Sequence, residues 1–185
     1  MANRSGRANT KFAVLGILAL GPHTGYDIKQ HMDQSTSYFW NENYGQIYPS
    51  LAELLDNSDI NLEVIRQDGK PDKKLYRITD QGRETLSQWL SQPKDYVVDL
   101  KKNELLLRVF FGSNGSSEKI IMHIEAYQRK LEENLKVFEE LEKWLLNMEH
   151  KDNNYKYWMI TNQYGKNHFT SLIQWCKDSI IILKS

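Results

Sequence analysis

Several features that identify common classes of protein are scarce in this chain of 185 residues. Cys176 is the sole cysteine, so no intrachain disulfide is possible, and the chain suits a reducing compartment such as the cytoplasm. Because this thiol lies in an apolar run with Trp175 and Ile180, a buried structural role is favoured over a nucleophilic one.

Long hydrophobic runs are also missing. The nearest candidate, residues 12–20, follows Arg4 and Arg7 and so resembles the start of a signal peptide. It is too short to span a bilayer, which takes about 20 residues, and it ends in Gly21-Pro22-His23 rather than in a cleavage site. We therefore expect a buried first helix and no membrane segment.

Motifs of enzymes and metal proteins are absent from the sequence. No His-x-x-x-His or Cys-x-x-Cys metal spacing occurs among the single cysteine and the five histidines, His23, His31, His123, His150 and His168. There is no glycine-rich phosphate loop and no nucleophile motif. We therefore expect no catalytic residues, no metal site and no cofactor.

Net charge is absent as well, because 24 Lys and Arg balance 24 Asp and Glu. Residues 1–92 hold ten basic and eleven acidic side chains, so they provide no broad basic field for nucleic acid. Only residues 66–77 are locally basic, with five basic side chains against two acidic ones. A DNA-binding function would therefore depend on this small patch and on pairing two copies of the chain.

What is present in residues 10–92 is a helical pattern with turn signals. Thr10 is expected to cap a first helix ending near Leu20, and Thr24 a second helix ending near Gln34. A third helix begins near Tyr44, with Pro49 close to its start, where the missing N–H costs least.

Two strands and a fourth helix follow. Residues 60–64 alternate apolar and polar side chains, as in a half-buried strand, and Asp68-Gly69 signals a turn before a returning strand over residues 75–78. Thr79 is placed to cap the fourth helix, which is expected to bury Leu86, Trp89 and Leu90 and to stop before Pro93. This order is that of a winged helix-turn-helix, in which a helix N-terminus enters the major groove and the wing lies along the backbone.

Residues 93–185 are predicted to form a second, helical domain after a boundary at residues 93–98. We expect helices over residues 99–111, 117 to about 148, and about 154 to 183. Apolar residues of the middle helix recur in alternate steps of four and three, which is typical of a coiled-coil seam of roughly four heptads. The seam comprises Ile120, Ile124, Tyr127, Leu131, Asn134, Phe138, Leu141, Leu145 and Met148.

This seam is expected to pair two copies of the chain, because two long helices have few interior contacts of their own. Asn134, its one polar member, either fixes the register or lies at a wet edge. Gly165 falls in the middle of the last helix, where glycine costs about 1 kcal/mol relative to alanine. We interpret it as a site of close approach by another helix or an aromatic ring. The residues assigned to dimerisation are Ile124, Tyr127, Leu131, Asn134, Phe138, Leu141 and Leu145.

Several short segments, in their order and spacing, resemble the PadR family of bacterial transcriptional regulators. They are Gly25-Tyr26-Asp27-Ile28, Phe39-Trp40, Gln46-Ile47-Tyr48-Pro49-Ser50-Leu51, the stretch 69–76, and Ile78-Thr79 with Gly82. Residues 102–111 resemble the start of the family's C-terminal helical region, with Asn103 where the family often has Asp. The resemblance includes the long-tailed subfamily that holds the phenolic-acid repressor and the virulence activator. The fold expected is therefore mainly α with a small β-hairpin wing, followed by long dimerisation helices.

The resemblance implies a homodimer that binds double-stranded operator DNA; family members mostly repress transcription. Gln46 can present an amide to a base edge, most naturally adenine, and tyrosine hydroxyls can bond phosphate oxygens. The wing lysines would add sequence-independent attraction, although a solvated turn and a half-buried Tyr48 are the simpler alternatives. The residues assigned to DNA binding are Tyr26, Tyr44, Gln46, Tyr48, Ser50, Lys70, Lys73 and Lys74.

Several family members are released by a small aromatic effector. We expect such a ligand, an aromatic acid, where the winged domain meets the C-terminal helices, held by Tyr38, Trp40, Phe111 and Trp158. The alternative is that these rings are plain core. A second class of function also stays open at this stage: a winged helix with a coiled-coil tail that binds proteins and never touches DNA, which the near-neutral winged domain supports.

Overall fold

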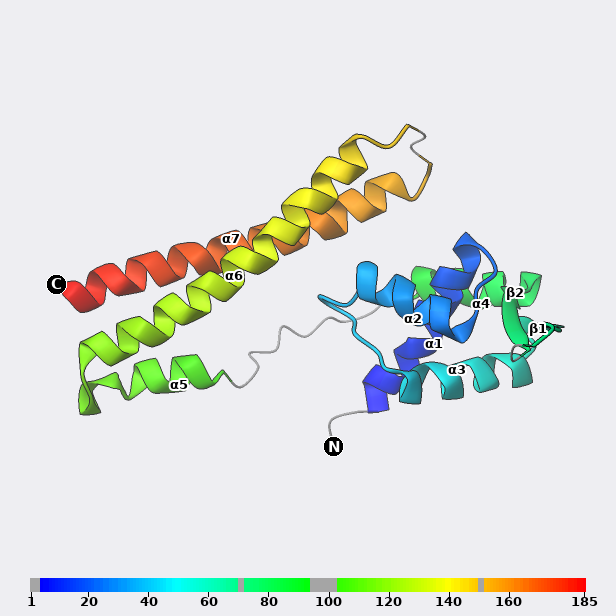
Figure 1. The fold of residues 1–185 in the computed structure, drawn as a ribbon, viewed down its shortest axis with the longest axis horizontal. Helices are drawn as coiled ribbons and strands as arrows, with labels where there is room; N and C mark the ends of the chain where they lie inside the picture. The colour runs from blue at the N-terminus through cyan, green and yellow to red at the C-terminus, as the bar shows by residue number, and fades with distance from the viewer. Residues whose placement is uncertain (1–3, 70–71, 94–102, 150–151) are drawn as a thin grey trace. The chain divides into compact units, whose positions relative to one another are not determined.

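The computed structural model describes residues 4–69, 72–93, 103–149 and 152–185, drawn in Figure 1. The chain divides into two compact units, residues 1–97 and 98–185, and each is described by itself. The predicted boundary segment lies largely outside the described residues. The first unit contains α1 (Arg4–Leu20), α2 (Gly25–Gln34), α3 (Tyr44–Asp56), β1 (Ile60–Ile65), β2 (Lys73–Ile78) and α4 (Asp80–Ser91).

The second unit contains α5 (Glu104–Phe110), a short 3-10 turn (Gly112–Asn114), α6 (Ser117–Leu146) and α7 (Tyr155–Lys184). The predicted fold class, three helices, a two-stranded wing and a helix followed by long helices, is confirmed. No helix in the described parts of the chain is both long and apolar enough to cross a membrane.

Local side-chain hydrogen bonds fix where the helices of the first unit begin. Thr24 and Asp27 form a capping box, in which each side chain accepts a hydrogen bond from the other residue's N–H, at 3.1 and 2.9 Å. Thr79 caps α4 by accepting from the N–H of Gly82 at 3.0 Å. Both caps lie where the sequence predicts them, because each depends only on residues three positions apart.

The predicted cap at Thr10 is wrong. Helix α1 begins at Arg4, so Thr10 lies inside the helix, where it is buried. Its hydroxyl donates instead to the Glu42 carboxylate at 2.7 Å. Glu42 is itself buried just before α3, so this bond ties the middle of α1 to the entry of the third helix.

The core of the first unit forms around α1. Val14, Leu15 and Leu18 of α1 are buried against apolar residues of the other elements: Ile28, Met32, Ile47, Leu51, Leu54, Ile60 and Tyr76. Leu86 of α4 packs half-buried against this core. Trp89 of α4 stacks on Phe12 with ring centroids 4.7 Å apart, but Trp89 and Leu90 are 37% and 69% exposed, contrary to prediction.

The wing is an antiparallel pair of strands whose register runs from Ile60 opposite Ile78 to Ile65 opposite Lys73. Only Ile60 of β1 is buried, and Leu62 and Val64 are exposed. The expectation of a half-buried strand was therefore wrong beyond its first residue, because the hairpin projects past the core that covers Ile60.

In the second unit, α6 and α7 lie side by side, as Figure 1 shows. Ile124 and Leu131 of α6 pack against Ile173 and Cys176 of α7. Cys176 is buried as predicted, and burial raises the pKa of its thiol.

This packing corrects the predicted dimer seam. Four of its members, Ile124, Leu131, Phe138 and Leu145, are buried within the single chain and leave almost no surface for a second copy. Their partner is α7 of the same chain. Tyr127, Asn134 and Leu141 are half-buried and keep some surface, so their role in dimerisation stays a prediction.

Candidate nucleic-acid interface

The first turns of α3 present two tyrosines to solvent. Tyr44 and Tyr48 are 41% and 50% exposed, and their rings stack with centroids 6.0 Å apart. This i, i+4 pair places two hydroxyl groups on the outer face of the helix that the sequence assigns to DNA. Tyr26, at the start of α2, is also exposed.

Gln46 has a structural task that the sequence did not reveal. Its side-chain oxygen accepts a hydrogen bond from the N–H of Asn43 at 3.0 Å, which closes the N-terminus of α3. One lone pair of the amide oxygen is thus engaged, and its second lone pair and the NH₂ group remain for another partner. A bidentate contact with adenine needs both an acceptor and a donor, so its acceptor would be shared with this cap.

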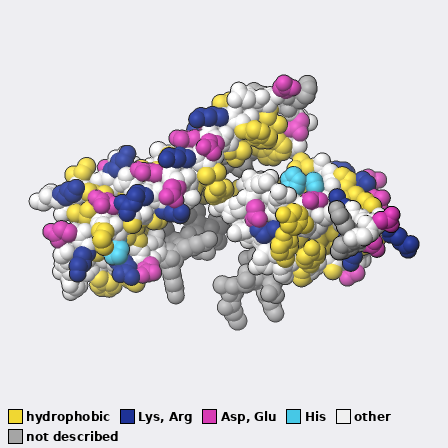
Figure 2. All heavy atoms as spheres, in the orientation of Figure 1, with side chains coloured by type: hydrophobic (Ala, Val, Ile, Leu, Met, Phe, Trp, Pro, Cys, Tyr) yellow, Lys and Arg dark blue, Asp and Glu magenta, His cyan; other side chains and the backbone are white. Residues whose placement is uncertain are grey.

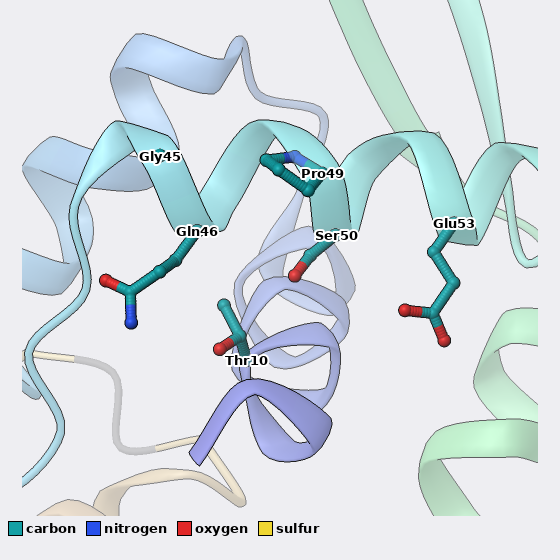
Figure 3. A pocket seen from close by; sticks show the side chains of 6 residues that line it. All are labelled: Thr10, Gly45, Gln46, Pro49, Ser50 and Glu53. Atoms are coloured by element: carbon teal, nitrogen blue, oxygen red, sulfur yellow. The ribbon is translucent and has the colours of Figure 1, made fainter. Parts of the chain in front are cut away.

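Ser50 does not belong to the exposed face. It is buried, and it lines a hollow of about 370 Å³ between α1 and α3, shown in Figure 3. Pro49 lies beside it in the wall of the hollow, and Thr10 faces it from α1. The burial contradicts a direct contact between Ser50 and DNA, because this side of α3 turns toward α1.

The wing provides exposed cations. Lys73 and Lys74 are exposed at the start of β2, whereas Lys70 lies outside the described residues. Arg77, on the same strand, forms an ion pair with Glu63 across the hairpin at 3.2 Å. Its charge is thus partly balanced, and Arg66, Lys73 and Lys74 are the other exposed cations of the described wing.

The base of the wing is attached to the turn between α1 and α2. The N–H and C=O groups of His23 pair with those of Tyr76, at 3.2 and 2.9 Å. Burial raises the pKa of Tyr76, and the nearby Tyr48 adds to this effect. Helix α3, helix α2 and the wing therefore meet at one place.

The titratable side chains of Asp27, His23 and His31 lie at this junction. The hydrogen bond from the Thr24 N–H is the main cause that lowers the pKa of the Asp27 carboxyl. Burial, followed by the proximity of His31, lowers the pKa of His23, and Asp27 partly opposes this. The two imidazole rings have centroids 4.4 Å apart.

The residues assigned to an effector are divided between the units. Tyr38 and Trp40 belong to the first unit, Phe111 and Trp158 to the second, and their joint site stays a prediction. The indole N–H of Trp40 is buried and has no acceptor among the described residues. Asn103 caps α5 by accepting from the N–H of Leu106 at 3.2 Å, a structural task that an Asp carboxylate would perform equally well.

Sequence reasoning missed Glu42 and Gly25. Glu42 bonds a residue 32 positions away, and no local pattern signals such a contact. Gly25 does have a signal, since it is a glycine at the first position of a helix, directly after the cap. Within the described ranges, no group of three or more His, Cys, Asp or Glu side chains could hold a metal ion.

Comparisons with known proteins cover nearly the whole chain. Residues 14–88 match the transcriptional regulator PadR-like family, and residues 101–184 match the virulence activator alpha C-terminal family. Over 103 residues, 56% of each chain, the protein is 35% identical to the negative transcriptional regulator PadR of Bacillus subtilis. A probable transcriptional regulator of Mycobacterium tuberculosis is 36% identical over 81 residues, and the matched stretches span about half the length of both relatives, 56% and 43%.

Solved structures extend the likeness beyond those stretches. The structure of Bacillus subtilis PadR in complex with operator DNA is similar with a TM-score of 0.80 and 25% identity, over 94% of this chain and 98% of that one. The structure of the same protein with p-coumaric acid shows the same fold, with a TM-score of 0.77 and 22% identity over 100% and 99% of the two chains. The two successive family matches and the shared fold show that this chain belongs to the PadR family of transcriptional regulators, with a C-terminal extension of the virulence-activator type.

Proposed function

We propose that the chain is a homodimeric repressor that binds operator DNA through α3 and the wing of each protomer. The observation that carries this proposal is the grouping of exposed Tyr44 and Tyr48 with the cations Lys73 and Lys74 around one junction. The tyrosine hydroxyls bond phosphate oxygens and the lysines add sequence-independent attraction. Bacillus subtilis PadR, solved with its operator, supports the assignment.

The wing gives the first test. Replacing Lys73 and Lys74 by alanine should weaken binding to operator and random duplexes alike, because phosphate contacts carry no sequence information. Each lost contact lowers the slope of log K against log salt by about 0.9, so the loss is about two units per protomer. Fluorescence titration at several salt concentrations measures this slope.

A matched control removes the same charge elsewhere. Lys136→Ala with Lys177→Ala changes two exposed lysines of the second unit and should leave the slope unchanged. An unchanged slope in the wing variant would remove the wing from the interface. Absence of any shift by the wild-type protein on its own upstream region would instead favour a protein-interaction module.

Repression released by an aromatic acid completes the proposal. The indole N–H of Trp40, which finds no acceptor in the described part of the chain, can donate to a carboxylate, and Bacillus subtilis PadR has been solved with p-coumaric acid. Titration calorimetry with p-coumaric acid should give heat, and the ligand should weaken operator binding. Trp40→Phe keeps the ring but removes the donor, so it should lower the affinity for the acid while leaving operator binding intact. No heat and unaltered operator binding would exclude this acid as the effector.

A further inference from the structure

The first residue of α2, Gly25, lies directly under the ring of Tyr48. A Cβ atom placed on Gly25 would come within 2.8 Å of Tyr48 Cε1, and within 3.1 Å of both Cζ and the hydroxyl oxygen. These three atoms are the nearest ones to that position. The tyrosine ring therefore occupies space that the side chain of any other residue would need.

The surface beneath the ring is firmly held. The capping box of Thr24 and Asp27 fixes the start of α2, and the backbone pairing of His23 with Tyr76 fixes the turn before it. Tyr48 itself is half exposed, and its ring stacks on that of Tyr44. The ring's direction is thus set by two neighbours, the Tyr44 ring and the bare backbone of Gly25.

We infer that Gly25 is a positioning residue for DNA recognition: by lacking a Cβ atom, it lets Tyr48 lie against the start of α2 with its hydroxyl directed toward a DNA phosphate. The inference rests on the proposed function, since it concerns how Tyr48 reaches DNA. Gly25 touches no DNA in this account. It acts only through the ring that it admits.

The physics separates this role from a role in stability. The obstacle to a new Cβ is the outer end of an exposed side chain, which can rotate away, rather than backbone. Alanine is also a better helix former than glycine. Gly25→Ala should therefore leave the thermal unfolding midpoint unchanged or slightly higher, while the Tyr48 hydroxyl moves away from its place.

A double-mutant cycle tests the inference by operator titration with fluorescence anisotropy. We expect Gly25→Ala to weaken operator binding about tenfold per protomer, the scale of one lost hydrogen bond. Tyr48→Ala should weaken it by a similar factor. The double variant should bind like Tyr48→Ala alone, because the new methyl group then has no ring to displace.

Gly16→Ala is the matched control, since a Cβ there meets nothing within 4 Å, and it should bind the operator like the wild type. If Gly25→Ala lowers the unfolding midpoint, adding Tyr48→Ala must restore it, because the nearest obstacles all belong to that ring. Wild-type affinity in Gly25→Ala, or purely additive losses in the double variant, would overturn the inference. Failure of the wild-type protein itself to bind the operator would overturn the proposed function instead.

Discussion

The two units of this chain differ in how completely they cover their apolar surface. In the first, apolar residues from five other elements converge on α1, and Thr10 and Glu42 add a buried polar contact. In the second, a pair of long helices buries one stripe, while Ile182 of α7 and Phe110 of the short α5 stay exposed by 72% and 80%. Figure 2 shows hydrophobic side chains at the surface of the α6–α7 pair. The first unit thus closes its core on all sides within a single chain, although Leu90 and Val64 stay exposed, whereas the second unit leaves the outer faces of its helices as apolar surface for a further partner.

The largest loss of stability is expected from a side chain placed in a tight contact of the first unit. A Cβ on Gly82 would lie 2.0 Å from the carbonyl oxygen of Asp59. Because that obstacle is backbone, Gly82→Ala should cost about 3 kcal/mol or more in the free energy of unfolding of this unit. Denaturant titration followed by circular dichroism measures the loss. Gly16→Ala is the control with open space, and equal stability of the two variants would contradict this account.

A charge placed on the exposed apolar surface of the second unit tests whether a second copy of the chain covers that surface. Phe110→Asp should leave the folding of one chain intact, since the ring is mostly solvated there. If a second copy covers it, dimerisation should weaken by about 2 kcal/mol per protomer, the scale of one buried aromatic side chain. Sedimentation equilibrium measures this. Leu90→Asp, an equally radical change at an exposed residue of the first unit, should leave the association constant unaltered; an equal effect of both variants would argue against dimerisation through the second unit.

The smallest effect concerns pH and the first unit alone. Burial and His31 lower the pKa of His23 in the folded state. The unfolded chain therefore binds a proton more readily, so the contribution of His23 is complete above pH about 6.5 and is lost as pH falls through the lower folded value. The unfolding midpoint of the first unit should decline on acidification, less so in His23→Gln. An unchanged pH profile in that variant would remove His23 from the explanation.

The parts of the fold that the sequence predicts are those decided by near neighbours. Thr24 and Thr79 cap helices because their partners lie three residues away. Gly165 was expected to admit a ring, and a Cβ there would lie 2.1 Å from Phe138. Spacing alone, however, does not name the partner of a helical stripe: the seam that suggested two chains packs on α7 of the same chain.

In the candidate site, too, the sequence predicts what near neighbours decide and misses what distant contacts decide. The sequence placed Tyr44 and Tyr48 at the start of the third helix, where their i, i+4 spacing puts them on one face, and the structure shows both exposed. It could not show that the opposite side of the helix turns toward α1, which buries Ser50. Nor did it reveal that the side-chain oxygen of Gln46 accepts a hydrogen bond from the N–H of Asn43. The burial of Ser50 depends on which elements meet in space, and the bond of Gln46 depends on the conformation of the chain at the helix start.

The pairing of His23 with Tyr76 makes the root of the wing part of the helical body. This pairing and the strand register, which runs from Ile60–Ile78 to Ile65–Lys73, hold the hairpin in place. An insertion or an exchange of residues at the hairpin tip should therefore leave the angle between the wing and α3 unaltered. Evolution, or an engineer, can therefore lengthen, shorten or recharge the tip to suit a different DNA sequence without altering α2, α3 or the base of the wing.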